Sequence, residues 1–138
     1  MAERQAQNYR TIQHSGEYGN CRMAVLEDTL AADGIADVIQ LGQIAGSSRI
    51  VDVILYNAAL GASTTLDVGY RYLTTADGTD DENGFIAAQD TSSAVRTSMA
   101  GDVDTIADGD GVEIVAVVGG AAATGKITVV VLYDWVGQ

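Results

Sequence analysis

The segment 120–126 comes closest to a motif that could do chemistry. Its sequence GAAATGK matches the G-x-x-x-x-G-K pattern of a phosphate-binding P-loop. However, Ile127 stands where that motif needs the serine or threonine that binds magnesium. A P-loop also opens a helix whose N-terminus faces the phosphates, whereas the residues ITVVVLYDW that follow Lys126 favour a strand. We therefore interpret the segment as a hairpin loop that joins two strands.

Two acidic segments could bind calcium, which takes roughly six to eight oxygen ligands. One reads DGTDDENG from Asp77, and the other reads DVDTIADGDG from Asp102. Neither has the glutamate that closes an EF-hand loop, so solvated turn carboxylates are the simpler interpretation. A calcium site shared between loops or subunits is the alternative, and its weak candidate ligands are Asp77, Asp80, Asp81, Asp108 and Asp110.

Residues suited to catalysis are scarce. His14 is the single histidine and Cys21 the single cysteine, too few for a typical zinc site. A Cys21–His14 dyad would stand in a polar segment without the preorganisation that catalysis requires. Paired carboxylates of the glycosidase type are available, yet one Trp and one Phe offer little platform for a sugar. We predict a protein that is not an enzyme and has no cofactor.

The composition narrows the class of partner. A chain of 138 residues with 47% hydrophobic residues suits one domain with a substantial core. The net charge of -12, from 19 acidic and 7 basic residues, disfavours binding to nucleic acid and to anionic membranes. The first twenty residues lack the apolar run of a signal peptide. A binding or structural role is therefore favoured.

Beyond residue 20 the chain is dominated by runs rich in valine, isoleucine, threonine and tyrosine, which favour strands. Pairs such as Asp33-Gly34 and Asn83-Gly84 separate these runs and suit tight turns. The stretch 85–99 favours strand and loop over helix. Strands are expected in six strong runs: 22–26, 37–44, 49–56, 63–74, 111–118 and 126–136.

The pattern inside two runs predicts which faces are buried. In 63–74, apolar residues alternate with polar ones, so one face is expected to carry Leu66, Val68, Tyr70 and Tyr72. The run 49–56 leaves almost no polar face, which predicts a strand covered on both sides. Together the runs predict an all-β fold, a β-sandwich or jelly-roll-like domain of about eight strands. The domain is expected to span 21–138, after an extended N-terminal arm at 1–20.

The polar arm is expected either to fray or to become ordered on a partner. Binding to a capsid or a neighbouring subunit would use its anchors, which we predict to be Tyr9, Arg10, Ile12 and Tyr18. Arg49 and Arg71 stand in or beside apolar strands. Arginine stems commonly lie along a sheet, and ion pairs between subunits are a weaker expectation for these two residues.

The strand sequences also resemble a known family. The stretch 35–73 contains D-x-I-x-L-G-x-I at 37–44, R-I-x-D-V at 49–53 and A-L-G-x-S-T-T-L-D-V-G at 59–69. With the acidic loop, FIAAQDTSSA at 85–94 and the valine-rich C-terminal strands, this pattern is similar to tailed-phage head decoration, or cement, proteins. The likeness covers about residues 22–136.

The resemblance implies a β-sandwich or jelly roll without catalytic residues. It also implies a homotrimer that is made in the host cytoplasm and binds the major capsid protein on the outer surface of the virion. Bridging between capsomers would stabilise the shell. For such a protein, deleting residues 1–20 is expected to weaken attachment to the head while leaving the domain folded.

Two other classes of function are retained as alternatives. A calcium-stabilised module that binds carbohydrate or a host surface would melt at a higher temperature with calcium. Another virion part, such as a tail-tube or head-completion protein, would form rings of defined symmetry in isolation.

Overall fold

The computed structural model describes residues 2–6, 9, 12–13, 21–101, 104–106 and 109–135. These residues form strands and loops and contain no helix, and hence none long and apolar enough to cross a membrane. Eight strands have four or more residues: β3 (Arg22–Asp33), β4 (Val38–Ile44), β5 (Ser48–Asn57), β6 (Thr65–Tyr72), β7 (Asp81–Asp90), β8 (Val95–Ser98), β10 (Val112–Gly119) and β11 (Ala123–Trp135). Three are shorter: β1 (Glu3–Gln5), β2 (Ile12–Gln13) and β9 (Asp104–Thr105).

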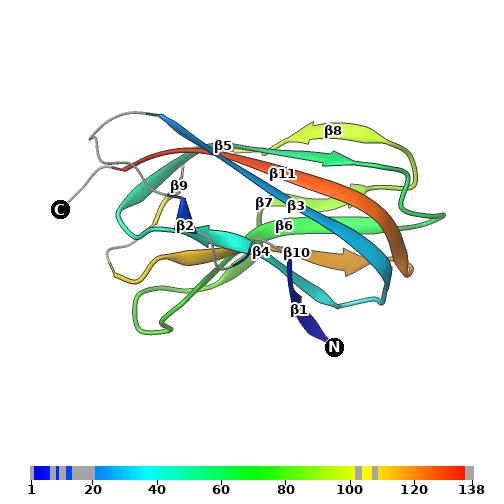
Figure 1. Ribbon diagram of the computed structural model, residues 1–138, viewed down its shortest axis with the longest axis horizontal. Helices are drawn as coiled ribbons and strands as arrows, with labels where there is room; N and C mark the ends of the chain where they lie inside the picture. The colour runs from blue at the N-terminus through cyan, green and yellow to red at the C-terminus, as the bar shows by residue number, and fades with distance from the viewer. Residues whose placement is uncertain are drawn as a thin grey trace.

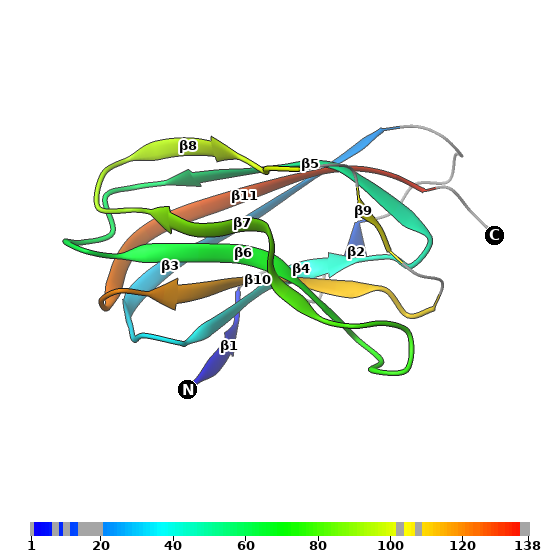
Figure 2. The ribbon, with the colours of Figure 1, turned by 180° about the vertical axis from the view of Figure 1, so that it is seen from behind.

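The strands form two stacked sheets (Figures 1 and 2). Sheet A has the order β1-β4-β10-β6-β7, with β2 also paired to β4. Sheet B has the order β3-β11-β5-β8, with β9 also paired to β5. The eight longer strands pair antiparallel as β3 with β11, β4 with β10, β5 with β8 and β6 with β7. This nested pairing is that of a jelly roll, which confirms the fold class predicted from the sequence.

The core lies between the sheets and is built from alternate positions of each strand. Leu66 and Val68 are fully buried there, and Tyr70 and Tyr72 pack against the same cluster, so the predicted inner face of β6 is confirmed. Sheet B contributes alternate aliphatic residues in the same way: Leu26, Val53, Leu55, Ile127, Val129 and Val131.

The predicted hairpin between the two valine-rich strands is wrong. β10 lies in sheet A between β4 and β6, whereas β11 lies in sheet B between β3 and β5. The connection therefore passes from one sheet to the other, and each strand buries its inner face against the opposite sheet. Gly120 makes this corner with a φ of +72°, and a Cβ there would lie 2.0 Å from the carbonyl oxygen of Ser63.

A predicted turn is also wrong, because Asn83-Gly84 lies inside β7. The pairing of β7 with β6 shifts register twice, between Leu66 and Val68 and between Val68 and Tyr70. A glycine inside a strand commonly marks such an irregularity. Tertiary pairing has thus overridden the local turn signal.

Candidate docking surface

The outer face of β5 is open, which corrects the prediction that this strand is covered on both sides. Val53 and Leu55 point into the core, while the side chains of Val51 and Tyr56 are 42% and 43% exposed. No described element packs over this face of sheet B, since the described residues form two layers only. The described residues therefore bury only one face of the apolar strand β5.

Apolar residues continue across the neighbouring strands in register. Val130 of β11 pairs with Val25 of β3 on one side and with Ile54 of β5 on the other. Two residues further along β11, on the same face, Leu132 pairs with Met23. Because directly opposed residues share a face, these residues form one surface, which we call the apolar face: Met23, Val25, Ile54, Tyr56, Val130 and Leu132.

The rim of the apolar face is exposed and its centre is not. Met23 and Val25 are 61% and 44% exposed, whereas Val130 is only 8% exposed between its neighbours on β3 and β5. Isolated exposed apolar residues are common on protein surfaces, but a contiguous group on one sheet face marks an interaction site.

Charge on this side of sheet B is balanced. The outward positions of the described strands carry three acidic residues, Glu27, Asp52 and Asp134, and three basic ones, Arg49, Arg96 and Lys126. These charges cancel, so the acidic excess of the chain, -12 overall, lies elsewhere. The surroundings of the apolar face therefore carry little net charge.

A groove of about 470 Å³ lies beside the apolar face, where β5, β8 and β11 come together. Tyr56 forms one wall, and the Arg96 guanidinium carbon lies 5.8 Å from the centre of its ring. The Nε of Arg96 donates a hydrogen bond to the Tyr56 hydroxyl at 3.4 Å. Lys126 lies on the opposite strand and forms an ion pair with Glu27 at 3.0 Å. The groove thus combines two cations with an aromatic ring.

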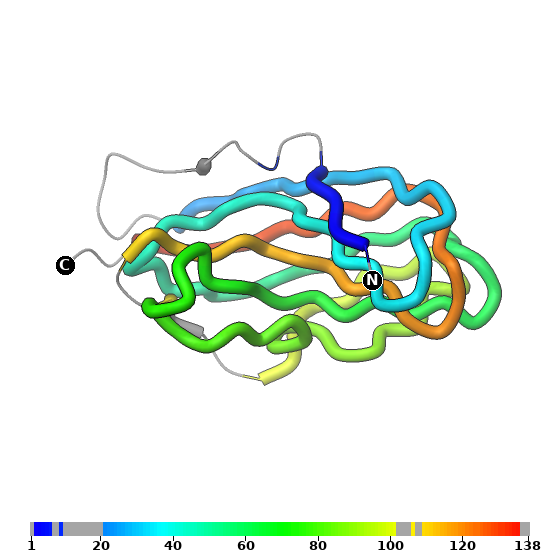
Figure 3. Tube along the Cα trace, turned by 90° about the horizontal axis from the view of Figure 1, so that it is seen from below, coloured from blue at the N-terminus to red at the C-terminus, as the bar shows by residue number. Residues whose placement is uncertain are grey.

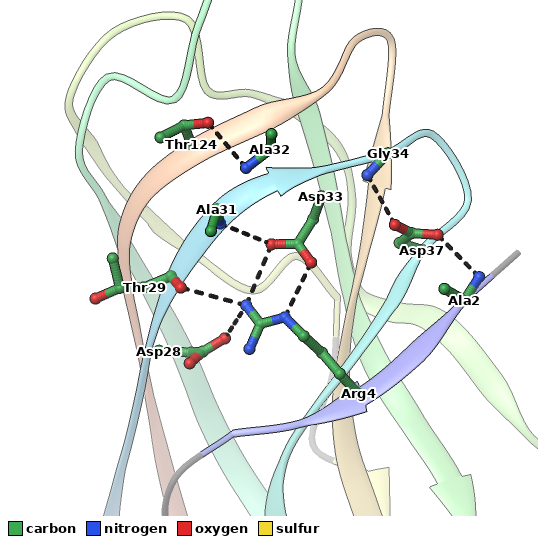
Figure 4. Close-up of polar contacts among 10 residues, drawn as sticks. All are labelled: Ala2, Arg4, Asp28, Thr29, Ala31, Ala32, Asp33, Gly34, Asp37 and Thr124. Carbon is green, nitrogen blue, oxygen red and sulfur yellow. Dashed lines mark hydrogen bonds and ion pairs between the residues drawn. The ribbon is translucent and has the colours of Figure 1, made fainter.

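The N-terminal strand β1 lies along the side of the sandwich, where it pairs parallel with β4 (Figure 3). Its Arg4 reaches across to β3 in the other sheet (Figure 4). Arg4 Nε donates to Asp33 at 2.9 Å, and Arg4 Nη2 lies against Asp28 and donates to the Thr29 carbonyl at 3.3 Å. The edges of sheets A and B are therefore joined by a single side chain.

A second set of contacts fixes the same segment on the outer side of sheet A. Arg71 of β6 forms ion pairs with Glu3 at 2.9 Å and with Glu113 of β10 at 3.4 Å. The hydroxyl of Tyr9 donates to the same Glu113, and both residues are buried. Burial raises the pKa of Tyr9, so its hydroxyl keeps the proton that it donates.

The arm residues predicted from the sequence are placed only in part. Tyr9 is buried on its own domain and Ile12 lies in β2, whose pairing with β4 is parallel. Arg10 and Tyr18 lie outside the described residues. Hence the described part of segment 1–20 is joined to sheet A, and its binding to a capsid or a neighbour stays a prediction.

The two arginines predicted for ion pairs between subunits find carboxylates within the chain. Arg49 contacts Asp134 at 2.5 Å, and Arg71 contacts the carboxylates already named. Pairing within the domain thus accounts for both. Ion pairs between subunits stay a prediction for these residues.

The weak calcium candidates are dispersed in the described structure. Asp77 accepts a hydrogen bond from the backbone N–H of Asp110 at 3.1 Å, so these two loops meet. Asp80 accepts from the N–H of Tyr72 at 2.8 Å, and Asp81 begins β7. Asp108 lies outside the described residues. Among the described residues, no group of three or more His, Cys, Asp or Glu is placed to hold a metal ion.

The Arg4 contacts predict how stability depends on pH. The Arg4 guanidinium holds the pKa of the Asp33 carboxyl below its ordinary value. A lowered folded-state pKa stabilises the fold above the unfolded value near 4, and this contribution is lost as pH falls through the lower folded value. The variant Arg4→Gln is therefore expected to lower the melting temperature at pH 7, and this difference is expected to shrink progressively as the pH falls below about 4.

Thermal unfolding of both proteins between pH 2.5 and 7 measures this difference. The charge-matched control is Arg96→Gln, which removes an arginine that contacts Tyr56 and not a carboxylate in the described structure. A constant difference in melting temperature between Arg4→Gln and wild type over the whole range would contradict the expectation.

Comparison with solved structures places this fold among phage capsid chains. A chain in the capsid of Ralstonia phage GP4 is similar with a TM-score of 0.80 and 20% identity over 99% of each chain. A chain of the cyanophage Pam1 capsid asymmetric unit has a TM-score of 0.64 and 18% identity over 93% of this chain and 94% of that one. The protein has the fold of these capsid chains.

A third similar chain comes from the acidic stable capsid structure of Helicobacter pylori bacteriophage KHP30. Its TM-score is 0.64 and its identity 22%, over 88% of this chain and 92% of that one. No protein family model matches the sequence. No curated protein matches it either. The phage resemblance seen in the sequence is thus confirmed at the level of the fold.

Sequence reasoning missed the apolar face as a site. The signal was present, because the dense apolar run 49–56 needs a cover on both sides. The sequence alone does not identify what covers the second side. The structure shows that the described chain leaves it open, and the pairing of Val25 and Ile54 with Val130 could be known only once the strand order was known.

Proposed function

We propose that this protein is a non-enzymatic structural component of a tailed-phage virion, which decorates the outer surface of the head. The apolar face of sheet B is the single observation that carries the proposal. It binds the major capsid protein and so covers the side chains that the free chain leaves open. Bridging between capsomers then stabilises the shell.

Three features support this role over a catalytic one. The fold is similar over nearly the whole chain to chains from phage capsids. The chain is strongly acidic, yet the apolar face carries no net charge. Binding at many equivalent sites on a shell also accumulates strength from modest single contacts.

The proposed assembly is a homotrimer on the shell. A jelly roll has a broad sheet face and separate strand edges, so one surface can bind the shell while another contacts neighbours. Sedimentation of the purified protein measures the state before binding. A stable trimer in solution agrees with the proposal, and so does a monomer that forms trimers only on the head. Large rings in solution instead favour a tail-tube or head-completion role.

The test is to add purified protein to heads assembled from the major capsid protein of the same phage without this chain. We expect saturable binding, protrusions on the outer surface in electron micrographs, and heads that resist heating better than bare heads. A lack of binding to such heads would contradict the proposal. Protein found only on tails or at the portal vertex would also contradict it.

A further inference from the structure

Within the described part of a chain of net charge -12, Arg96 has no carboxylate partner. Among the described residues, no carboxylate lies within ion-pair distance of its guanidinium, whose contacts are with the ring and hydroxyl of Tyr56. Four other described cations do form ion pairs with carboxylates: Arg4, Arg49, Arg71 and Lys126. The Arg96 guanidinium, which has no such ion pair among the described residues, can therefore bind a carboxylate of another molecule.

The surroundings of Arg96 are built to hold it in place. Asn57 at the end of β5 donates from Nδ2 to the carbonyls of Ala58 at 2.7 Å and Ser93 at 2.9 Å. These bonds fix the segment before β8, and the pairing of Arg96 with Tyr56 across the strands sets its direction. A preorganised cation loses less side-chain freedom when it binds.

Lys126 supplies a second positive charge to the same groove. Its partner Glu27 is on the same sheet face, and the two side chains are 59% and 48% exposed. An exposed pair of this kind is weak, so Lys126 can also turn towards a second carboxylate. The groove is open along the sheet, and Tyr56, Val95, Arg96 and Lys126 are among the residues that line it.

We infer that this groove binds an acidic, extended segment of the protein partner. A glutamate or aspartate carboxylate lies between Arg96 and Lys126, and the adjoining aliphatic groups pack on Val95 and the Tyr56 ring. The inference rests on the proposed function, because Tyr56 belongs both to the groove and to the apolar face. The groove inference goes beyond the proposed function by specifying that the partner segment in the groove is acidic.

A peptide fits the groove better than an inorganic anion. Apolar side chains and an exposed ring line much of its wall, and Val95 is 38% exposed. An extended chain can lie along the groove over β5, between β8 and β11.

Titration of the ¹⁵N-labelled protein with acetyl-Gly-Glu-Glu-Glu-Gly-amide tests the groove directly by NMR. We expect amide shifts to concentrate at Tyr56, Val95, Arg96 and Lys126, and the matching glutamine peptide to produce none. Arg96→Gln should weaken binding by about 10-fold or more. The control Arg49→Gln removes the same charge from β5 outside the groove and should bind as wild type does.

Shifts that appear elsewhere, or that persist unchanged in Arg96→Gln, would overturn the inference. So would equal shifts with inorganic phosphate or with phosphatidylglycerol vesicles, since these would indicate a site for anions in general. Binding to bare heads separates the two proposals. If wild type and Arg96→Gln bind heads equally, the groove inference fails and the decoration role stands; if neither binds heads while the peptide shifts the groove, the decoration role fails.

Discussion

The variant Val25→Glu is expected to lose at least about 30-fold in affinity for bare heads while remaining folded. Val25 lies on the apolar face, opposite Val130, and is 44% exposed in the free protein. Docking would remove the new carboxylate from water without a partner, and an unpaired charge buried in an interface costs about 2 kcal/mol or more. In the free protein the carboxylate stays solvated, so we expect the unfolding free energy to change by less than about 1 kcal/mol.

Cosedimentation with heads measures this affinity, and thermal unfolding measures stability. Ile35→Glu is the matched control, since Ile35 is 62% exposed in the turn after β3 and lies off the apolar face. It adds the same charge in place of a β-branched side chain and should bind heads as wild type does. Equal binding by Val25→Glu and Ile35→Glu would show that the apolar face is not the docking surface.

Deleting residues 1–20 is expected to lower the unfolding free energy by about 3 kcal/mol, which corresponds to roughly 10 °C in melting temperature for a chain of this size. From the sequence we expect such a deletion to leave the domain folded, and the structure adds that the folded domain loses stability. Ala6 and Tyr9 are buried on the domain, and Arg4 joins the edges of the two sheets. Removing them also leaves one edge of β4 without its strand partners, and an open edge promotes aggregation.

Chemical denaturation of the full-length and truncated proteins measures the loss. Tyr9→Phe is the informative control, because it keeps the ring and removes only the hydroxyl that donates to the buried Glu113. We expect it to cost about 1–3 kcal/mol, the usual effect of leaving a buried acceptor unsatisfied. Truncated protein as stable as the full-length chain would contradict the structural role of the segment.

The fold class followed from local patterns that act over a few residues. Alternation at Leu66, Val68, Tyr70 and Tyr72 fixed the inner face of β6, because successive side chains of a strand point to opposite sides. The order of the strands in the two sheets could not be predicted from such local patterns. β10 and β11 are adjacent in the chain and were expected to pair, yet each pairs with strands remote in sequence. Which strands meet depends on how two whole sheets pack, which no short window of sequence contains.

The candidate site shows the same division. By itself the sequence determined an all-β, acidic chain with dense apolar runs in its strands, because composition and periodicity act locally. Only the tertiary structure decided which of these apolar residues stay exposed. It brought Val25, Val130 and Ile54 into one row and placed Arg96 over Tyr56 beside them. It also brought Arg4 of β1 next to Asp33 of β3. Such contacts form only once strands from distant parts of the chain lie side by side.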